Sequence, residues 1–392
     1  MQGIRVLDFS HVLAAPYGTM LLGDLGADVI KVESVDRGDA LRSTPPLKDS
    51  LSAYYFCANR NKRCIAIDLK KPAAKELIFR LAKGCDVFAE NFRPKVMDCL
   101  GLGYEDIKKI RPDVIYASLS AFGDIGPYKE RPGFELIIQS LAGLVGVTSS
   151  KDGRPSKVQP QIADIGGGMF LAIAVLGAII HRLRTGRGQL VKTSLLEGLL
   201  AFMTHFIYMH LWDYKIRYGL ETRNPMMFPS QSFKTGDGYL SVVVVPDHWQ
   251  RFCKALGRPE WIEHPEYAKP VYRVQHYSEM EAMVEKVMAT KTTAEWLEIF
   301  KAHDVACSQI NTVEQMLEDP QIRALDLFRT LSSPKLGDFK VQTAPWHMSE
   351  TPPRTRRLPP SLGEHTTEIM REFGYSTSEI TELKKEGVIA GD

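Results

Sequence analysis

The residues best suited to chemistry lie between Gln161 and Met169, where Asp164 is followed two positions later by three consecutive glycines, Gly166 to Gly168. In one interpretation Asp164 is a helix N-cap, whose carboxylate accepts backbone N–H bonds. A cap explains the aspartate but not the glycines, each of which costs roughly 1 kcal/mol relative to alanine in a helix. Close approach of a ligand to bare backbone at Gly166 and Gly167 would explain them.

A helix that begins beside Asp164 would also shape the chemistry of its carboxylate. The N-terminus of a helix presents unpaired N–H groups and positive partial charge, which we expect to keep Asp164 ionised and to stabilise an oxyanion that forms beside it. An ionised carboxylate is a competent nucleophile toward an activated acyl group. On spacing alone, the cap and the nucleophile both stay open.

Other common sites are missing from the sequence. No G-x-G-x-x-G, P-loop or G-x-S-x-G pattern occurs, which disfavours nicotinamide dehydrogenases, P-loop NTPases and nucleophile-elbow hydrolases. The six cysteines form no C-x-x-C pair and no Cys/His cluster has zinc spacing, so we predict reduced thiols and no metal site. His205 and His210 are five residues apart, which is poor for one helical face, and are interpreted as core or interface residues.

The charge and hydrophobicity of the sequence indicate which kinds of binding partner and which location to expect. The 392 residues carry 49 Lys and Arg against 47 Asp and Glu, a net charge of +2, which favours small molecules or protein chains over nucleic acid or a membrane surface. The longest apolar run, 169–180, is shorter than the roughly 20 residues that cross a bilayer and predicts a buried core helix. Met1 leads into an apolar strand without a basic leader, which predicts a cytoplasmic location.

The first 120 residues alternate β-rich runs with helical periods, the pattern of a parallel sheet covered by helices. Helices are expected at 14–25 and 72–83, the second with Pro72 in its first turn. The expected strands are 4–8, 29–32, 64–68, 87–90 and 114–118. We predict an α/β fold with a doubly wound, Rossmann-like large domain.

The rest of the chain predicts a second, smaller domain. Apolar helices are expected at 166–184, ended by Gly186, and at 195–212. From Met226 a hairpin turn at 233–239, a strand at 240–245 and charged amphipathic helices indicate an α+β domain. After a Pro-rich linker at 351–360, the helical pair at 368–387 is expected to return to the first domain. The large domain is thus 1–225 and 328–392, with 226–327 inserted.

An ordered set of motifs covers essentially the whole chain. It consists of the segments 6–16, 22–33, 59–63, 86–94, 131–135, Asp164 with its glycines, 185–189 and 362–366. Together these motifs resemble the class III CoA-transferases of the CaiB/BaiF family, which includes formyl-CoA transferase and carnitine CoA-transferase.

The resemblance implies that Asp164 is the catalytic nucleophile. Its carboxylate would attack an acyl-CoA thioester, and the released thiolate would attack the resulting anhydride to leave an aspartyl-CoA thioester. An acceptor acid would then take the CoA by the reverse steps. Glu135 would orient or polarise the acyl group, unless it is a structural carboxylate. Acyl-CoA is a substrate, and no tightly bound cofactor is implied.

The resemblance also assigns the CoA groove. Val12, Leu13 and Ala14 would line the nucleotide, Lys70 and Arg93 would meet phosphates, and Asn91 and Phe92 would lie along the groove at the end of a central strand. Formyl-CoA transferase-like chains have an arginine where this chain has Ser34, which leaves Arg37 or Arg42 as candidates for the adenine end. The small domain lacks the tetraglycine loop of the formyl-CoA enzyme, which disfavours oxalate and formyl-CoA as substrates.

Two alternatives to transfer stay open. An α-methylacyl-CoA racemase needs a second base, where a histidine in that family corresponds to Phe134 here, and phenylalanine exchanges no proton. A non-catalytic acyl-CoA-binding protein would gain stability from alanine at the three glycine positions. Succinyl-CoA or a similar dicarboxyl-CoA is the expected donor of a transferase. The resemblance further implies an interlocked homodimer.

Overall fold

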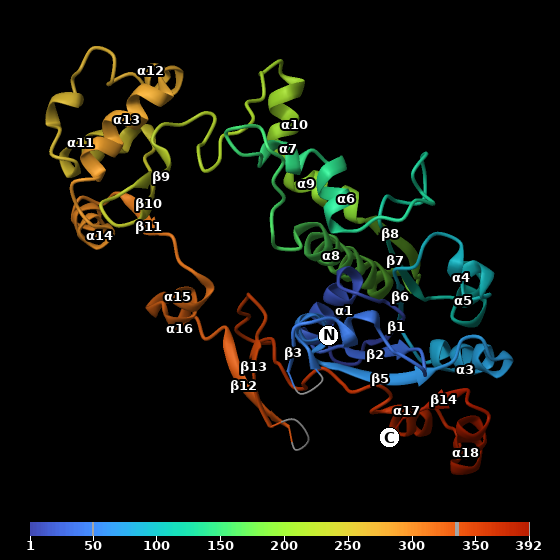
Figure 1. The fold of residues 1–392 in the computed structure, drawn as a ribbon. Helices are drawn as coiled ribbons and strands as arrows, with labels where there is room; N and C mark the ends of the chain where they lie inside the picture. The colour runs from blue at the N-terminus through green and yellow to red at the C-terminus, as the bar shows by residue number, and fades with distance from the viewer. Residues whose placement is uncertain (49–50, 334–336, 392) are drawn as a thin grey trace. The chain divides into compact units, whose positions relative to one another are not determined.

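The computed structural model describes residues 1–48, 51–333 and 337–391, which fall into two units (Figure 1). The larger unit comprises Met1–Leu144, Val158–Trp212 and Asp326–Asp392, and the smaller comprises Val145–Lys157 and Asp213–Leu325. The smaller unit thus begins before the expected Met226 and includes a piece far upstream. Hydrogen bonding gives the reason, since the Gly219 amide donates to the Ser149 hydroxyl across that distance in sequence.

A seven-stranded sheet forms the centre of the larger unit, and it confirms the predicted α/β class. Six strands are parallel, and the seventh, β14 (Ile389–Ala390), runs antiparallel to β5. The strand order β14-β5-β2-β1-β6-β7-β8 contains the order typical of doubly wound dinucleotide-binding sheets, which reverses direction between β1 and β6. The six parallel strands are β1 (Arg5–Asp8), β2 (Asp28–Glu33), β5 (Lys62–Ile67), β6 (Val87–Glu90), β7 (Ile115–Ser120) and β8 (Gln189–Ser194).

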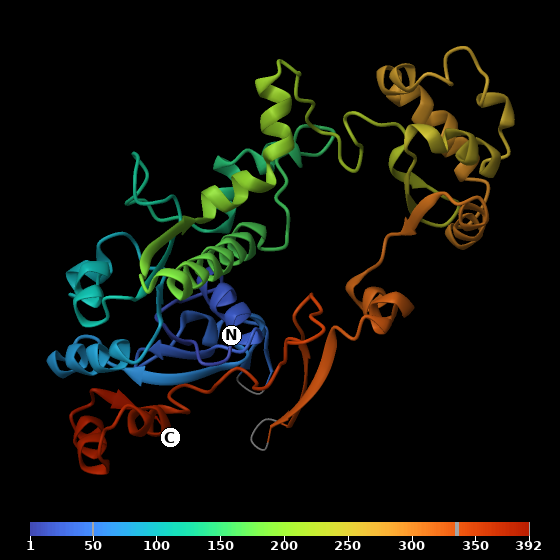
Figure 2. The ribbon, with the colours of Figure 1, turned by 180° about the vertical axis from the view of Figure 1, so that it is seen from behind.

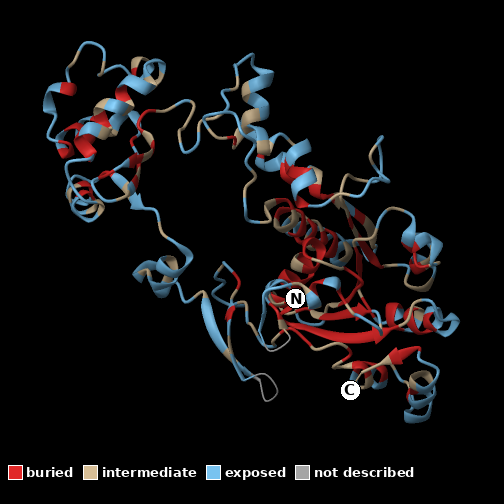
Figure 3. Ribbon diagram, in the orientation of Figure 1, coloured by how far each residue is buried: buried red, intermediate tan, exposed pale blue. Residues whose placement is uncertain are grey.

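Helices cover both faces of this sheet, whose strands are buried (Figure 3). On one face, α1 (Ala14–Asp24) and α8 (Ile162–Thr185) pack on residues such as Val6, Ala89 and Leu119. On the other, Leu7, Phe88 and their neighbours pack against α3 (Pro72–Lys83), α5 (Tyr104–Ile110), α17 (Thr366–Glu372) and α18 (Thr377–Lys385). This alternation of faces along each strand follows the two-residue period of side chains in a sheet.

The C-terminal tail returns to the large unit, as expected. β14 pairs with β5, and the Arg63 guanidinium on β5 binds Asp28 together with Glu368 and Glu372 of α17. These contacts join the two ends of the chain in one unit.

α8 is longer than the sequence predicts, because it begins at Ile162 rather than Gly166. By length and composition alone it could cross a membrane, but half of its most apolar stretch is buried inside the protein. It packs along α1 on the face of the sheet (Figure 2). This packing accounts for the buried apolar residues of α8, such as Leu171, Val175 and Ile179, and agrees with the predicted core helix, while Ile173, Ile180 and Leu183 remain exposed.

The expected helix at 195–212 is interrupted at Met203, which separates α9 (Leu195–Phe202) from α10 (Thr204–Leu211). Shorter elements complete the larger unit: β3 (Leu47–Lys48), β4 (Leu51–Ser52), α2 (Ala53–Asn59), α4 (Val96–Cys99), α6 (Glu135–Leu141), β12 (Phe328–Ser333) and β13 (Gly337–Gln342).

The smaller unit has its own antiparallel sheet and core. The sheet has the order β11-β10-β9, from β9 (Ser230–Lys234), β10 (Tyr239–Val243) and β11 (Ala306–Gln309). β9 and β10 form the predicted hairpin, and the core includes Phe233, Phe252 and Trp296. Its helices are α11 (Trp249–Ala255), α12 (Pro270–Gln275), α13 (Tyr277–Met288), α14 (Thr293–Ala302), α15 (Val313–Glu318) and α16 (Pro320–Ala324), while α7 (Leu144–Val147) lies at the first junction.

Candidate active site

A cavity of about 280 Å³ opens beside Asp164, outside the carboxyl ends of the central strands. Its position is where an open α/β sheet binds ligands, since the strand order reverses between β1 and β6. Its wall is made by residues 11–14 after β1, 91–94 after β6, 119–121 at the end of β7, Lys129 and 131–134 in the loop that follows, Asp164 on α8 and Leu195 on α9.

Asp164 occupies the third position of α8 and does not cap it. Gln161 is the N-cap residue, and its own side chain makes no capping hydrogen bond. Within the described residues no group donates a hydrogen bond to the Asp164 carboxylate. Burial, together with the nearby negative charge of Glu135, raises the pKa of Asp164 to about 7. The N-cap interpretation is therefore wrong, and burial and Glu135 oppose the expected effect of the helix end on the ionisation of Asp164.

Glu135 explains why the helix end does not lower this pKa. Its carboxylate accepts from the backbone N–H groups of Ala163 at 3.0 Å and Asp164 at 2.9 Å, and from Gln139 Nε2 at 2.7 Å. The amides of Ile162 and Ile165 donate to backbone carbonyls. The amides of residues 162–165 are thus all bonded within the protein, which contradicts the predicted oxyanion site at these groups. Glu135 is buried behind Asp164 and is absent from the cavity wall.

Close packing of neighbouring helices, rather than the approach of a ligand, explains the three glycines. A Cβ at Gly168 would clash with the Ala14 carbonyl of α1, and one at Gly167 would come within 2.9 Å of the Leu195 side chain. A Cβ at Gly166 would meet the ring of Phe202. The expectation that a ligand approaches bare backbone at Gly166 and Gly167 is therefore wrong, because protein fills that space. The glycines instead let α1 and α9 approach α8 closely.

The predicted groove residues after β1 and β6 do come together. Val12, Leu13 and Ala14 face the same cavity as Asn91, Phe92 and Arg93. The Asn91 side chain joins the two loops, because its Oδ1 accepts from the His11 amide at 2.7 Å and its Nδ2 donates to the His11 carbonyl at 2.8 Å.

Positive charge dominates the cavity wall. Arg93, Lys129 and Arg131 line it, whereas Asp164 is the one acidic residue among the described residues of the wall. Sequence reasoning did not assign Lys129 or Arg131, although Arg131 opens a motif that it singled out. Such a wall suits an anionic ligand.

Two expected cations lie elsewhere. Lys70 is exposed beyond the end of β5 and does not line this cavity. Arg42 is held by Glu33, with Nε–Oε2 at 2.7 Å and Nη2–Oε1 at 2.8 Å, and stacks on the Tyr55 ring. Arg37 is exposed beside Ser34, which leaves Arg37 as the better candidate of the two for an adenine-end contact.

A second cavity of about 390 Å³ adjoins the first and shares Phe92, Arg93 and Lys129 with it. Glu90 lies in its wall, and its Oε2 accepts from the Phe92 amide at 2.8 Å. Burial raises the pKa of Glu90 to about 7.

Comparison with known proteins adds an independent finding. A family model described as CoA-transferase family III matches residues 1–366. Human succinyl-CoA:glutarate CoA-transferase is 34% identical over 99% of this chain and 90% of its own length. Formyl-CoA:oxalate CoA-transferase of Rhodopseudomonas palustris strain BisB18 is 33% identical over 99% and 97%. The crystal structure of Rv3272 from Mycobacterium tuberculosis superimposes with a TM-score of 0.85, at 32% identity, over 94% of this chain and 98% of that one.

Proposed function

Because the chain belongs to CoA-transferase family III, and is therefore an enzyme, we propose that it moves CoA from an acyl-CoA to a free carboxylic acid through a thioester on Asp164. One observation carries the assignment. Among the described residues, Asp164 is the one acidic residue of a cavity wall that also contains three cations, and no hydrogen bond occupies its carboxylate.

The chemistry starts with an attack by an Asp164 carboxylate oxygen on the thioester carbonyl. The C–S bond breaks, CoA leaves as a thiolate, and a mixed anhydride joins the acyl group to Asp164. The thiolate then attacks the aspartyl carbonyl, which releases the donor acid and leaves aspartyl-CoA. The acceptor carboxylate attacks this thioester, and the thiolate attacks the acyl side of the second anhydride. The new acyl-CoA leaves and Asp164 is regenerated, with no net change in protons.

The surroundings of Asp164 suit this role. None of the residues that the structure describes donates a hydrogen bond to Asp164, which leaves its carboxylate lone pairs available, and the negative charge of Glu135 raises the basicity of the carboxylate. Glu135 acts through Asp164 and the helix end, and is therefore a positioning residue rather than one that touches the acyl group. Arg93, Lys129 and Arg131 supply positive charge for the CoA phosphates or the carboxylates of substrate and acceptor.

Succinyl-CoA or a similar dicarboxyl-CoA is the proposed donor. The human relative is named for transfer between succinyl-CoA and glutarate, and the bacterial relative for formyl-CoA and oxalate. Succinyl-CoA has a free second carboxylate and formyl-CoA has none, so the cations of the cavity wall support a dicarboxyl-CoA as the donor. A cytoplasmic location stays a prediction.

We also propose that two copies of the chain associate. Large apolar side chains are exposed on four helices of the larger unit, which is more than a monomer usually leaves in water. They include Leu136, Ile137 and Leu141 on α6, Ile173, Ile180 and Leu183 on α8, Phe202 on α9, and Tyr208 and Leu211 on α10. Light scattering is expected to give a dimer, and a stable monomer would contradict the proposal.

The rate of the first chemical step is expected to depend on pH through Asp164. The pKa of about 7 means that the nucleophile is protonated below neutrality, so the rate falls about tenfold per pH unit below pH 6 and levels off above pH 8. Single-turnover release of CoA thiol from succinyl-CoA measures this profile. A flat profile from pH 5 to 8 would contradict the raised pKa.

Glu135→Gln is expected to shift that profile to lower pH. Its negative charge raises the pKa of Asp164, so removing the charge lowers the midpoint of the rate profile. Glu197→Gln is the control, since it makes the same change in the first turn of another helix, where Glu197 accepts from Ser194 Oγ and does not affect the pKa of Asp164. Equal midpoints in the wild type and Glu135→Gln would contradict the coupling.

Incubation of the enzyme with succinyl-CoA and labelled acids tests transfer against the alternatives. Transfer predicts a labelled acyl-CoA. Solvent deuterium at the α-carbon without transfer would indicate a racemase, and binding without either reaction would indicate a non-catalytic protein. The three glycines no longer argue against that last case, because their packing explains them.

A further inference from the structure

The loop after β1 has an unusual conformation for the residues it contains. Val12 has a φ of 64°, in the left-handed region, which a β-branched residue rarely adopts. Such a conformation persists where the surrounding structure imposes it, and it often accompanies function. Val12 lies in the wall of the cavity beside Asp164.

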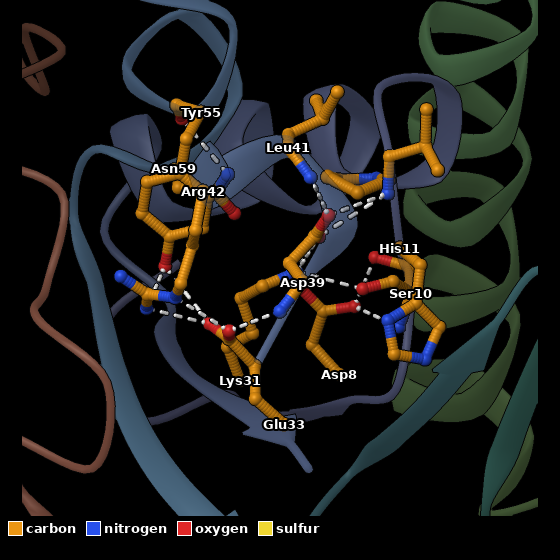
Figure 4. Close-up of polar contacts among 12 residues, drawn as sticks. Asp8, Ser10, His11, Lys31, Glu33, Asp39, Leu41, Arg42, Tyr55 and Asn59 are labelled. Carbon is orange, nitrogen blue, oxygen red and sulfur yellow. Dashed lines mark hydrogen bonds and ion pairs between the residues drawn. The ribbon is translucent and has the colours of Figure 1, made fainter. Parts of the chain in front are cut away.

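Buried side chains form hydrogen bonds with the backbone of this loop on the side facing the protein interior (Figure 4). The Ser10 amide donates to Asp8 Oδ1 at 3.0 Å, and the Ser10 carbonyl accepts from Lys31 Nζ at 2.7 Å. The His11 amide and carbonyl are both bonded to the Asn91 side chain. The Val12 amide donates to the Asp39 carboxylate, at 3.2 Å to Oδ1 and 3.1 Å to Oδ2.

Asp39 is itself fixed from several directions. It is 1% exposed, its Oδ2 binds Lys31 Nζ at 3.0 Å, and its amide donates to Glu33 Oε2 at 2.7 Å. Its Oδ1 also accepts from the Leu41 amide, as the cap of a short helical turn. Glu33 in turn is held by Arg42 and by the Tyr55 hydroxyl. Charges are thus balanced in pairs beneath the loop, and the carboxylate cannot shift without moving its partners.

We propose that Asp39 is a positioning residue for ligand binding, which keeps Val12 in its left-handed conformation and so sets the loop wall of the acyl-CoA cavity. The role of the cavity rests on the proposed function, but the role of Asp39 in loop geometry does not. Asp39 does not line the cavity that contains Asp164. It acts through the Val12 amide.

A double-mutant cycle separates positioning from a general contribution to stability. Glycine adopts positive φ without strain, so the need for Asp39 disappears when Val12 becomes glycine. We expect Asp39→Asn to weaken binding of coenzyme A at least about tenfold in the Val12 background, and less than about threefold in the Val12→Gly background, by calorimetry at low temperature. An equal loss in both backgrounds would overturn the proposal.

Asp24→Asn is the matched control. Asp24 is 3% exposed and bound to a buried cation, with Oδ1 at 3.0 Å from Arg60 Nε, but it does not touch the loop. We expect this variant to lose thermal stability without a change in affinity for coenzyme A. Affinities of Asp39→Asn and Asp24→Asn within twofold of each other would also overturn the proposal.

Amide hydrogen exchange on the wild-type protein keeps the proposal testable if Asp39→Asn does not fold. The Val12 amide is expected to exchange slowly although it lies in a loop, because Asp39 accepts its hydrogen. Exchange as fast as that of exposed amides would refute the role of Asp39. If the wild-type protein binds no coenzyme A, the proposed function fails. The exchange rate of the Val12 amide still tests whether Asp39 holds the loop.

Discussion

Asp164→Asn is expected to lower the rate of CoA transfer by about 10³-fold or more, because the amide is not a nucleophile and no other carboxylate of the described chain lines the cavity. Affinity for coenzyme A should not fall. Removing a negative charge from a wall with three cations favours an anionic ligand. Steady-state transfer rates and calorimetric titration with coenzyme A measure the two effects separately.

Glu197→Gln again supplies the comparison. Both residues are carboxylates at the third position of a helix in the larger unit, but Glu197 is absent from the wall that contains Asp164. Its substitution should leave the transfer rate within about threefold of wild type. Full activity of Asp164→Asn, or an equal loss in both variants, would contradict the assignment of the nucleophile.

Gly168→Ala is expected to destabilise the protein by about 3 kcal/mol, because the new methyl group would clash with backbone rather than with a movable side chain. The Ala14 carbonyl and the Gly18 amide of α1 face this position, the latter at 3.0 Å from the added Cβ. The displaced segment of α1 adjoins the loop that lines the cavity, so the affinity for coenzyme A should fall as well.

Gly177→Ala in the same helix is expected to stabilise the protein rather than destabilise it. Within one chain nothing lies within 4 Å of a Cβ at Gly177, so the substitution removes the helical cost of glycine and stabilises the chain itself by about 0.5–1 kcal/mol. Urea unfolding of both variants measures the difference. Equal stability of Gly168→Ala and Gly177→Ala would show that α1 and α8 do not pack as closely as described.

Much of the architecture follows from the sequence because buried strands and amphipathic helices have clear periods. The strand at 87–90 and the helix at 72–83 have the predicted bounds, and the helical pair of the tail does return to the sheet. The boundaries of the two units were harder to predict from the sequence. The contact that links residues 145–157 to the smaller unit joins residues 70 positions apart. Local patterns carry no signal of such a pairing.

The sequence predicts which residues form the site better than it predicts the protonation of Asp164 or the role of the glycines. Asp164 and the loops at 12–14 and 91–93 do meet at one cavity. The effect of the helix end on Asp164 was misjudged, because Glu135, 29 residues upstream, occupies the first-turn amides. The glycines were misread for a similar reason, since their partners Ala14 and Phe202 are remote in sequence. Asp39 lay within no recognised motif, and its role depends on a bond to Val12 that only the fold brings about.

Direct chemical trapping of the enzyme-bound intermediate tests the central claim most directly. Enzyme incubated with succinyl-CoA, quenched with hydroxylamine and digested should carry a hydroxamate on Asp164, in an amount that depends on the donor and disappears when a good acceptor acid is added. A protein that turns over acyl-CoA while Asp164 remains unmodified, or a modification that maps to another carboxylate, would contradict the account.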